Sequence, residues 1–73
     1  MNFEAKFTTE GENRVRTANV IEMRRSATEI KVQACDDLNG MRANGYVLIN
    51  GVIYAFEKTK YDLGVWTMKI ERV

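Results

Sequence analysis

The sequence lacks histidine and proline, and it holds a single cysteine among 73 residues. Without histidine, the commonest general base and metal ligand is missing, and neither a Ser-His nor a Cys-His nucleophile pair can form. The lone Cys35 has no partner for an intrachain disulfide, and one cysteine without histidine argues against a classical zinc site. The phosphate-binding patterns G-x-x-x-x-G-K and G-x-G-x-x-G are also missing. We therefore expect no enzyme, no cofactor and no metal.

An excess of charge of one sign is missing as well. Eleven basic and ten acidic residues leave a net charge of +1, which gives no global field to attract nucleic acid or anionic lipid. No segment approaches the roughly 20 consecutive apolar residues of a membrane span. The first residues, MNFEAKF, alternate charged and apolar side chains and lack the apolar core of a signal peptide. We expect a cytoplasmic protein without membrane contact.

What the sequence does contain is typical of one small folded domain, residues 1–73. Apolar residues make up 45% of the chain and charged residues 29%, which is ordinary for a globular protein. A chain of this length buries only about 60–65% of the surface that its unfolded form exposes. Since disulfides and metals are excluded, tight packing and self-association remain as means of stabilisation. We therefore expect a homo-oligomer.

The N-terminal part predicts a β-hairpin. Residues 3–8 alternate apolar and polar side chains, which indicates a half-buried strand, and Glu10 to Asn13 form a turn. Residues 14–25 fit a strand or a helix, and the preceding turn favours the strand. In that strand the inward residues are Val15, Thr17, Ile21 and Met23, and the outward residues are Arg14, Arg16, Glu22 and Arg24.

Residues 26–41 carry the signals of a helix. Ser26 and Glu29 form the capping pattern S-x-x-E, and Gly40 suits the end of a helix. Five apolar residues share one helical face: Ala27, Ile30, Ala34, Leu38 and Met41. A strand with Ile30, Val32 and Ala34 on one side is the alternative.

Three strands follow this predicted helix. Asn50-Gly51 is the strongest short hairpin signal, because a type I′ turn needs positive φ at both positions. After a second turn, Trp66, Met68 and Ile70 alternate with polar residues. The predicted order is β-β-α-β-β-β, an α+β fold in which one helix packs on one face of an antiparallel sheet of about five strands.

The hairpin around Asn50-Gly51 is apolar on both faces. A two-residue turn pairs Ile49 with Val52, Leu48 with Ile53, and Val47 with Tyr54. One face then carries Val47, Ile49, Val52, Tyr54 and Phe56, and the reverse face carries Tyr46, Leu48, Ile53 and Ala55. A single helix covers only one of them. The reverse face would be covered by a curled N-terminal half, by a second copy, or by a foreign macromolecule, and we predict it as an interface.

Arginines form a competing candidate surface. Guanidinium groups at Arg14, Arg16 and Arg24 would share one side of the second strand, with Arg25 and Arg42 nearby. They suit a nucleic-acid-binding module or, in an oligomer, a site for a phosphate-bearing small molecule. Tyr61 and Trp66 could stack bases, although the phase of Trp66 with Met68 favours the core.

The stretch LNGMRANGY, residues 38–46, resembles a family of short, uncharacterised bacterial and phage α+β domains. In these a helix ends in Leu-Asn, five residues follow, and Gly with Tyr or Trp opens a hairpin, as Leu38-Asn39 and Gly45-Tyr46 do here. The layout is also similar to that of small phage-encoded inhibitors, including anti-CRISPR proteins. The resemblance implies a phage or mobile-element protein that binds and blocks a larger partner through surface charges and aromatics.

Overall fold

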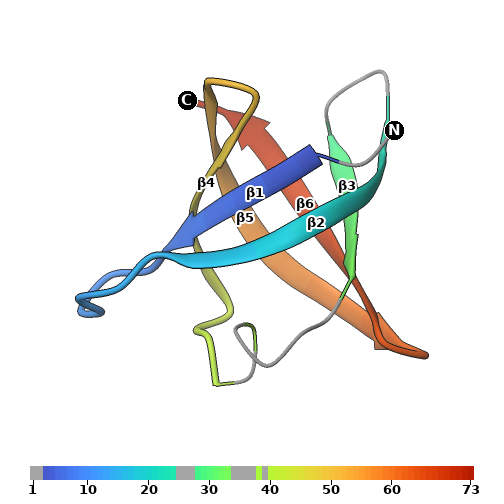
Figure 1. Ribbon diagram of the computed structural model, residues 1–73, viewed down its shortest axis with the longest axis horizontal. Helices are drawn as coiled ribbons and strands as arrows, with labels where there is room; N and C mark the ends of the chain where they lie inside the picture. Colours follow the sequence, from blue (N-terminus) through green and yellow to red (C-terminus); the bar gives the residue numbers. More distant parts are fainter. Residues whose placement is uncertain (1–2, 25–27, 34–37, 39) are drawn as a thin grey trace.

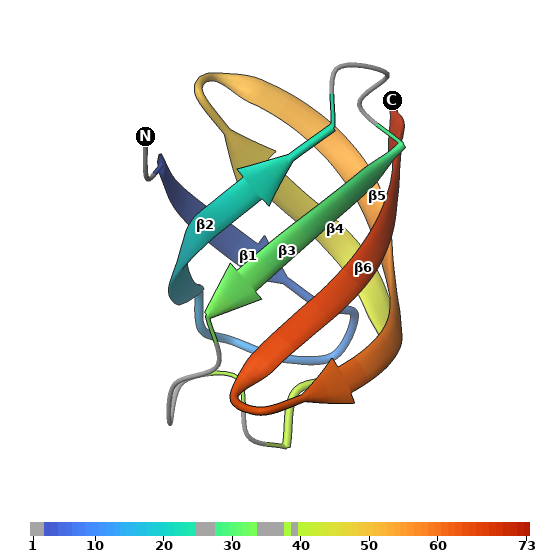
Figure 2. The ribbon, with the colours of Figure 1, turned by 90° about the vertical axis from the view of Figure 1, so that its right-hand side faces the viewer.

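The protein folds into a closed barrel of antiparallel strands. In this computed structural model the described residues are 3–24, 28–33, 38 and 40–73. The strands are β1 (Phe3–Thr8), β2 (Arg16–Met23), β3 (Glu29–Gln33), β4 (Asn44–Ile49), β5 (Val52–Asp62) and β6 (Val65–Arg72). They follow one another around the barrel in the order β1-β2-β3-β6-β5-β4 (Figures 1 and 2).

The topology is a Greek key. The strands β1, β2 and β3 form one meander, and β4, β5 and β6 form a second. After the first meander, β4 pairs with β1 and not with β3. The β3–β6 ladder closes the other side, where Glu29 pairs with Lys69 and Gln33 pairs with Val65. Closure gives the backbone groups of each strand partners on two sides.

Alternation along each strand fills the interior. Phe7 and Phe56 meet edge to face in the core, with ring centroids 5.2 Å apart. The largest fully buried side chains are Phe7, Val20, Ile30, Val32, Leu38, Val47, Ile49 and Met68. Apart from Leu38, they come from β1, β2, β3, β4 and β6, and β5 adds buried Tyr54 and Phe56. One core therefore holds both meanders together.

The barrel has two distinct ends, which the strand directions define. The β1–β2 loop, the segment before β4 and the β5–β6 turn lie at the lower end in Figure 2. The β4–β5 turn and the C-terminus lie at the upper end, with the N-terminal start of β1 on the same side. Loops far apart in the sequence therefore meet at the lower end.

The predicted helix is wrong, and with it the α+β class and the β-β-α-β-β-β order. Glu29–Gln33 is strand β3, and the described residues contain no α-helix. Ile30 and Val32 are buried between β2 and β6, as in the alternative strand interpretation. Glu29 does not serve a helix cap, because its carboxylate pairs with Arg24 at 3.3 Å. Ser26, Ala27, Ala34, Cys35 and Asn39 lie outside the described residues.

The second strand is confirmed, but its predicted inward face is largely wrong. Ala18 and Val20 are buried, whereas Val15 and Ile21 are exposed. The register with β1, which pairs Phe3 with Val20, fixes this phase. A bulge between Val20 and Glu22 then adds one residue, so Met23 returns to the inner side and packs against the core as expected.

Candidate functional site

The first candidate site is the outer face of the β4–β5 hairpin. The predicted pairs Ile49–Val52, Leu48–Ile53 and Val47–Tyr54 are all present. On the reverse of that hairpin, Tyr46, Leu48 and Ile53 are 55%, 39% and 53% exposed, and Ala55 is half-buried. We call Tyr46, Leu48, Ile53 and Ala55 the outer patch. Its residues adjoin across the two strands, so they form one continuous apolar area.

Polar residues of the neighbouring strands surround the outer patch. On β1, Lys6 pairs with Leu48 and Thr8 pairs with Tyr46. On β6, Glu71 pairs with Ala55. An open hollow of about 280 Å³ lies beside Tyr46. An apolar centre, a polar rim and a hollow beside an aromatic ring are the usual anatomy of a protein interface.

One of the three expected arrangements placed a curled N-terminal half over the outer patch. The described residues of that half do not cover it. The strands β1 and β2 close the barrel over the inner face instead, where Ala5 pairs with Ile49. Closure of the barrel thus buries one face of the β4–β5 hairpin and leaves the other face exposed to solvent. A second copy and a foreign macromolecule remain as the predicted covers.

The predicted arginine surface is divided between the two ends of the barrel. Arg14 and Arg42 belong to segments at the lower end, whereas Arg24 follows β2 at the upper end. Arg16 does not share an outward face with them, because it stands opposite Phe7 on the inner side of the barrel wall. Arg25 lies outside the described residues. No single surface therefore gathers the described four.

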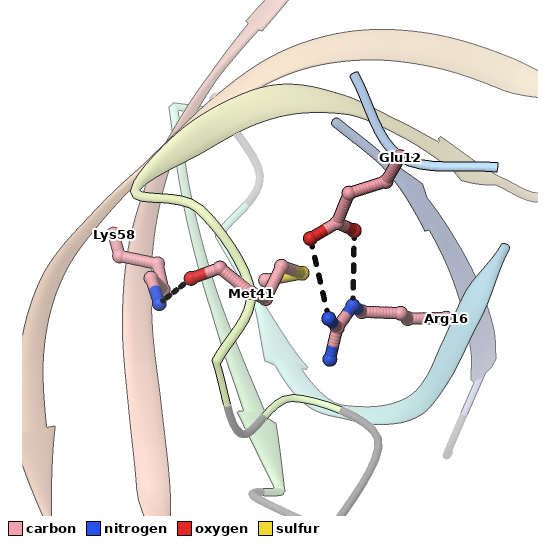
Figure 3. A network of polar contacts seen from close by, with 4 residues as sticks. All are labelled: Glu12, Arg16, Met41 and Lys58. Atoms are coloured by element: carbon pink, nitrogen blue, oxygen red, sulfur yellow. Dashed lines mark hydrogen bonds and ion pairs between the residues drawn. The ribbon is translucent and has the colours of Figure 1, made fainter. Parts of the chain in front are cut away.

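Arg16 forms a two-point ion pair with Glu12 at the lower end. Arg16 Nε donates to Glu12 Oε2 at 3.1 Å, and Arg16 Nη2 donates to Oε1 at 3.2 Å (Figure 3). The hydrogen bonds from Arg16 hold the pKa of Glu12 below its ordinary value. The pair fixes the β1–β2 loop against the start of β2.

Lys58, on β5, lies on the other side of Met41 from this pair (Figure 3). Its ammonium donates to the backbone carbonyl of Met41 at 2.6 Å and stands 4.7 Å from the ring centroid of Trp66. Burial lowers the pKa of Lys58, and the positive charge of Arg16 lowers it further.

An aromatic pair adjoins Lys58. The rings of Tyr61 and Trp66 are 4.8 Å apart at an angle of 58°. Trp66 packs against the core, as its phase predicted, while Tyr61 remains 54% exposed. We call Arg16, Lys58, Tyr61 and Trp66 the mouth cluster.

Sequence reasoning did not place Tyr61 beside Lys58, because a bulge after Lys58 changes the period of β5. Lys58 pairs with Met68 and Lys60 pairs with Thr67, so Thr59 is the extra residue. Its hydroxyl donates to the carbonyl of Thr67 at 3.0 Å. The bulge places Lys58 and Tyr61 on the inner side together, which simple alternation forbids.

No family model matches the chain, and neither a curated protein nor a solved structure matches it. The resemblance to short phage domains therefore stays a prediction, and the helix that it implied is a strand in the described part of the chain. Within the described ranges, no group of three or more cysteine or acidic side chains is placed to hold a metal ion. Nor does any helix there have the length and apolar character needed to cross a membrane.

Proposed function

We propose that this protein is a non-enzymatic interaction protein that binds and blocks a larger protein partner through the outer patch. The observation that supports the proposal is the contiguous exposure of Tyr46, Leu48 and Ile53 on paired strands. This role agrees with the one implied by the resemblance to phage-encoded inhibitors. The phage or mobile-element source stays a prediction.

The physical argument starts from the free energy of burial that exposed apolar side chains do not gain. An antiparallel sheet with one solvated side normally presents polar residues to water. Burying a large aliphatic side chain gains about 1.5–3 kcal/mol, and Leu48 faces Ile53 directly across the hairpin. A partner that covers both residues gains this free energy at one contact.

Rigidity and composition favour a specific contact over nonspecific adhesion. The outer patch lies on strands that hydrogen bond to neighbours on both sides, so little order is lost on binding. Tyr46 supplies a tyrosine, a residue type enriched where interfaces gain most of their energy. Lys6 and Glu71 on opposite borders offer charges of both signs to orient the partner.

Photo-cross-linking in the native cell tests the proposal. A photoreactive phenylalanine analogue replaces Tyr46 in one variant and Tyr61 in a second, since the two tyrosines are 55% and 54% exposed. After nuclease treatment, we expect a discrete product heavier than two chains from position 46 and not from position 61. No product at position 46, or the same products from both positions, would contradict the proposal. A product of two chain masses would identify a second copy as the occupant and would contradict a larger partner.

Binding of the cross-linked partner then measures the contribution of the patch. Placing a lysine at Leu48 or Ile53 would force an ammonium group into an apolar contact, and we expect each change to weaken binding by about a hundredfold. Leu63→Lys is the matched control, because Leu63 is exposed at the opposite end of the barrel. Equal losses for all three variants would show that the partner does not use the outer patch.

A further inference from the structure

We propose that the mouth cluster binds single-stranded nucleic acid, with a base stacked on Tyr61 and a phosphate bound by Lys58. The proposal is independent of the outer patch, because the mouth cluster lies at the lower end of the barrel and on its inner side.

The aromatic part of the argument concerns Tyr61. More than half of this side chain is exposed, at 54%, although Trp66 beside it packs against the core. Contact with Trp66 at 4.8 Å orients the exposed ring before any ligand arrives. A fixed, accessible aromatic ring is the platform on which proteins stack unpaired bases, and stacking tolerates any base because each has a π face.

The electrostatic part concerns Lys58. Its ammonium is held by the carbonyl of Met41 at 2.6 Å and stands over the ring of Trp66, so its position is fixed beside the aromatic pair. Burial lowers the pKa of Lys58, and the charge of Arg16 lowers it further. Arg16 itself is held at two points by Glu12. The ammonium of Lys58 has three hydrogens and donates one of them to Met41, so it can still donate to a phosphate oxygen.

The combination favours nucleic acid over a phosphorylated protein. A phosphoprotein site needs cations but no exposed ring, whereas here the ammonium and the exposed Tyr61 both contact Trp66. A nucleotide places a flat base and a phosphate within one residue, which fits an aromatic ring and a cation held side by side. A duplex would bind worse, because its bases are stacked among themselves.

Trp66 provides a direct readout, since it is the single tryptophan of the chain. We would titrate the wild-type protein with oligo(dT) and oligo(rU) of about ten nucleotides, within the usual size of a single-strand site. We expect saturable quenching of Trp66 fluorescence. With one phosphate contact, at Lys58, affinity should fall about two- to threefold between 50 and 200 mM salt.

The two exposed tyrosines again give a matched pair of variants. Because Tyr61→Ala changes the surroundings of Trp66, binding is followed here by the anisotropy of a fluorescein-labelled oligonucleotide. We expect Tyr61→Ala to weaken binding about tenfold and Tyr46→Ala to leave it unchanged. Lys58→Met keeps the aliphatic stem and removes the charge, so it should reduce the logarithmic salt slope by about 0.7. Thermal unfolding of each variant confirms that it is folded.

Three results would overturn the proposal. One is the lack of saturable binding to either oligonucleotide by wild-type protein at low salt. Another is equal weakening by Tyr61→Ala and Tyr46→Ala in folded variants. The third is tighter binding of a duplex of the same length than of the single strand, which would assign any affinity to phosphates alone.

Discussion

The two hairpins that share β5 turn with the same backbone but with different residues. Asn50 and Gly51 have φ values of 50° and 78°, and Leu63 and Gly64 have 48° and 81°. Asparagine tolerates this left-handed conformation, whereas leucine is strained there by roughly 1–2 kcal/mol. Leu63 gains nothing from packing in return, because it is 93% exposed. The first turn is thus favoured by its own residues, and the second is imposed by the strands that it joins.

The side chains that β5 contributes to the two hairpins also differ in their surroundings. Before the bulge at Thr59, β5 sends Phe56 into the core and Ile53 into solvent. Lys58 and Tyr61 flank the bulge, and both side chains contact Trp66. One strand therefore contributes residues to both the outer patch and the mouth cluster, and the bulge lies within the mouth cluster.

The largest expected effect tests whether the core depends on the first hairpin alone. Phe56→Ala removes a buried ring that meets Phe7 at 5.2 Å, and we expect a loss of about 3–5 kcal/mol in the free energy of unfolding. Tyr61→Ala, in the second hairpin, should cost less than about 1 kcal/mol because the side chain is exposed. Urea unfolding followed by circular dichroism measures both. Similar losses would show that the mouth cluster supports the fold as much as the core does.

A second, smaller effect compares the turns directly. Leu63→Asn should stabilise the protein by about 1 kcal/mol, because asparagine suits positive φ and no packing is lost. Asn50→Leu should destabilise it by a similar amount. The same urea measurement gives both values. A destabilising Leu63→Asn would reveal that the leucine contributes a contact within the folded chain.

The features of the fold that depend on neighbouring residues, namely the turn at Asn50-Gly51 and the alternation along strands, could be predicted from the sequence. The Asn50-Gly51 turn sets the register of β4 and β5, and this register follows from two residues. Alternation placed Met68 and Ile70 inside. The exposure of Tyr46 and Leu48 followed from the same register, so the outer patch was visible in the sequence before its surroundings were known.

Long-range pairing decided what the sequence did not reveal. Local cues around Glu29 favour a helix, but a strand there gains backbone partners from both β2, the strand directly before it, and β6, at the far end of the chain. Closure by this strand also explains why β1 and β2 cover the inner face of β4 and not its reverse. Arg16, Tyr61 and Trp66 were candidates from the sequence. Their grouping with Lys58 was not predicted, since the bulge at Thr59 leaves no clear signal in alternation.

A still smaller effect is expected on the outer patch. Ile53→Thr keeps a β-branched residue in the strand and should change the stability of the lone chain by less than about 0.5 kcal/mol. The measurement is thermal unfolding at several protein concentrations. A larger, concentration-dependent loss would mean that copies of the chain bury Ile53 against one another. That result would assign the outer patch to self-association and not to a foreign partner.

The smallest expected effect concerns the charges beside the second hairpin. Hydrogen bonds from Arg16 hold the pKa of Glu12 below its ordinary value of 4.5 in the folded protein, so the unfolded chain takes up a proton first as the pH falls. The stability that this pair contributes is therefore complete above pH 4.5 and is lost as the pH falls through the lower pKa of the folded state. Glu12→Gln lacks this titration while every other carboxylate is retained. We expect the difference in urea midpoint between wild type and Glu12→Gln to shrink from pH 7 to about pH 3. A constant difference would mean that Glu12 acts through its shape and not through its charge.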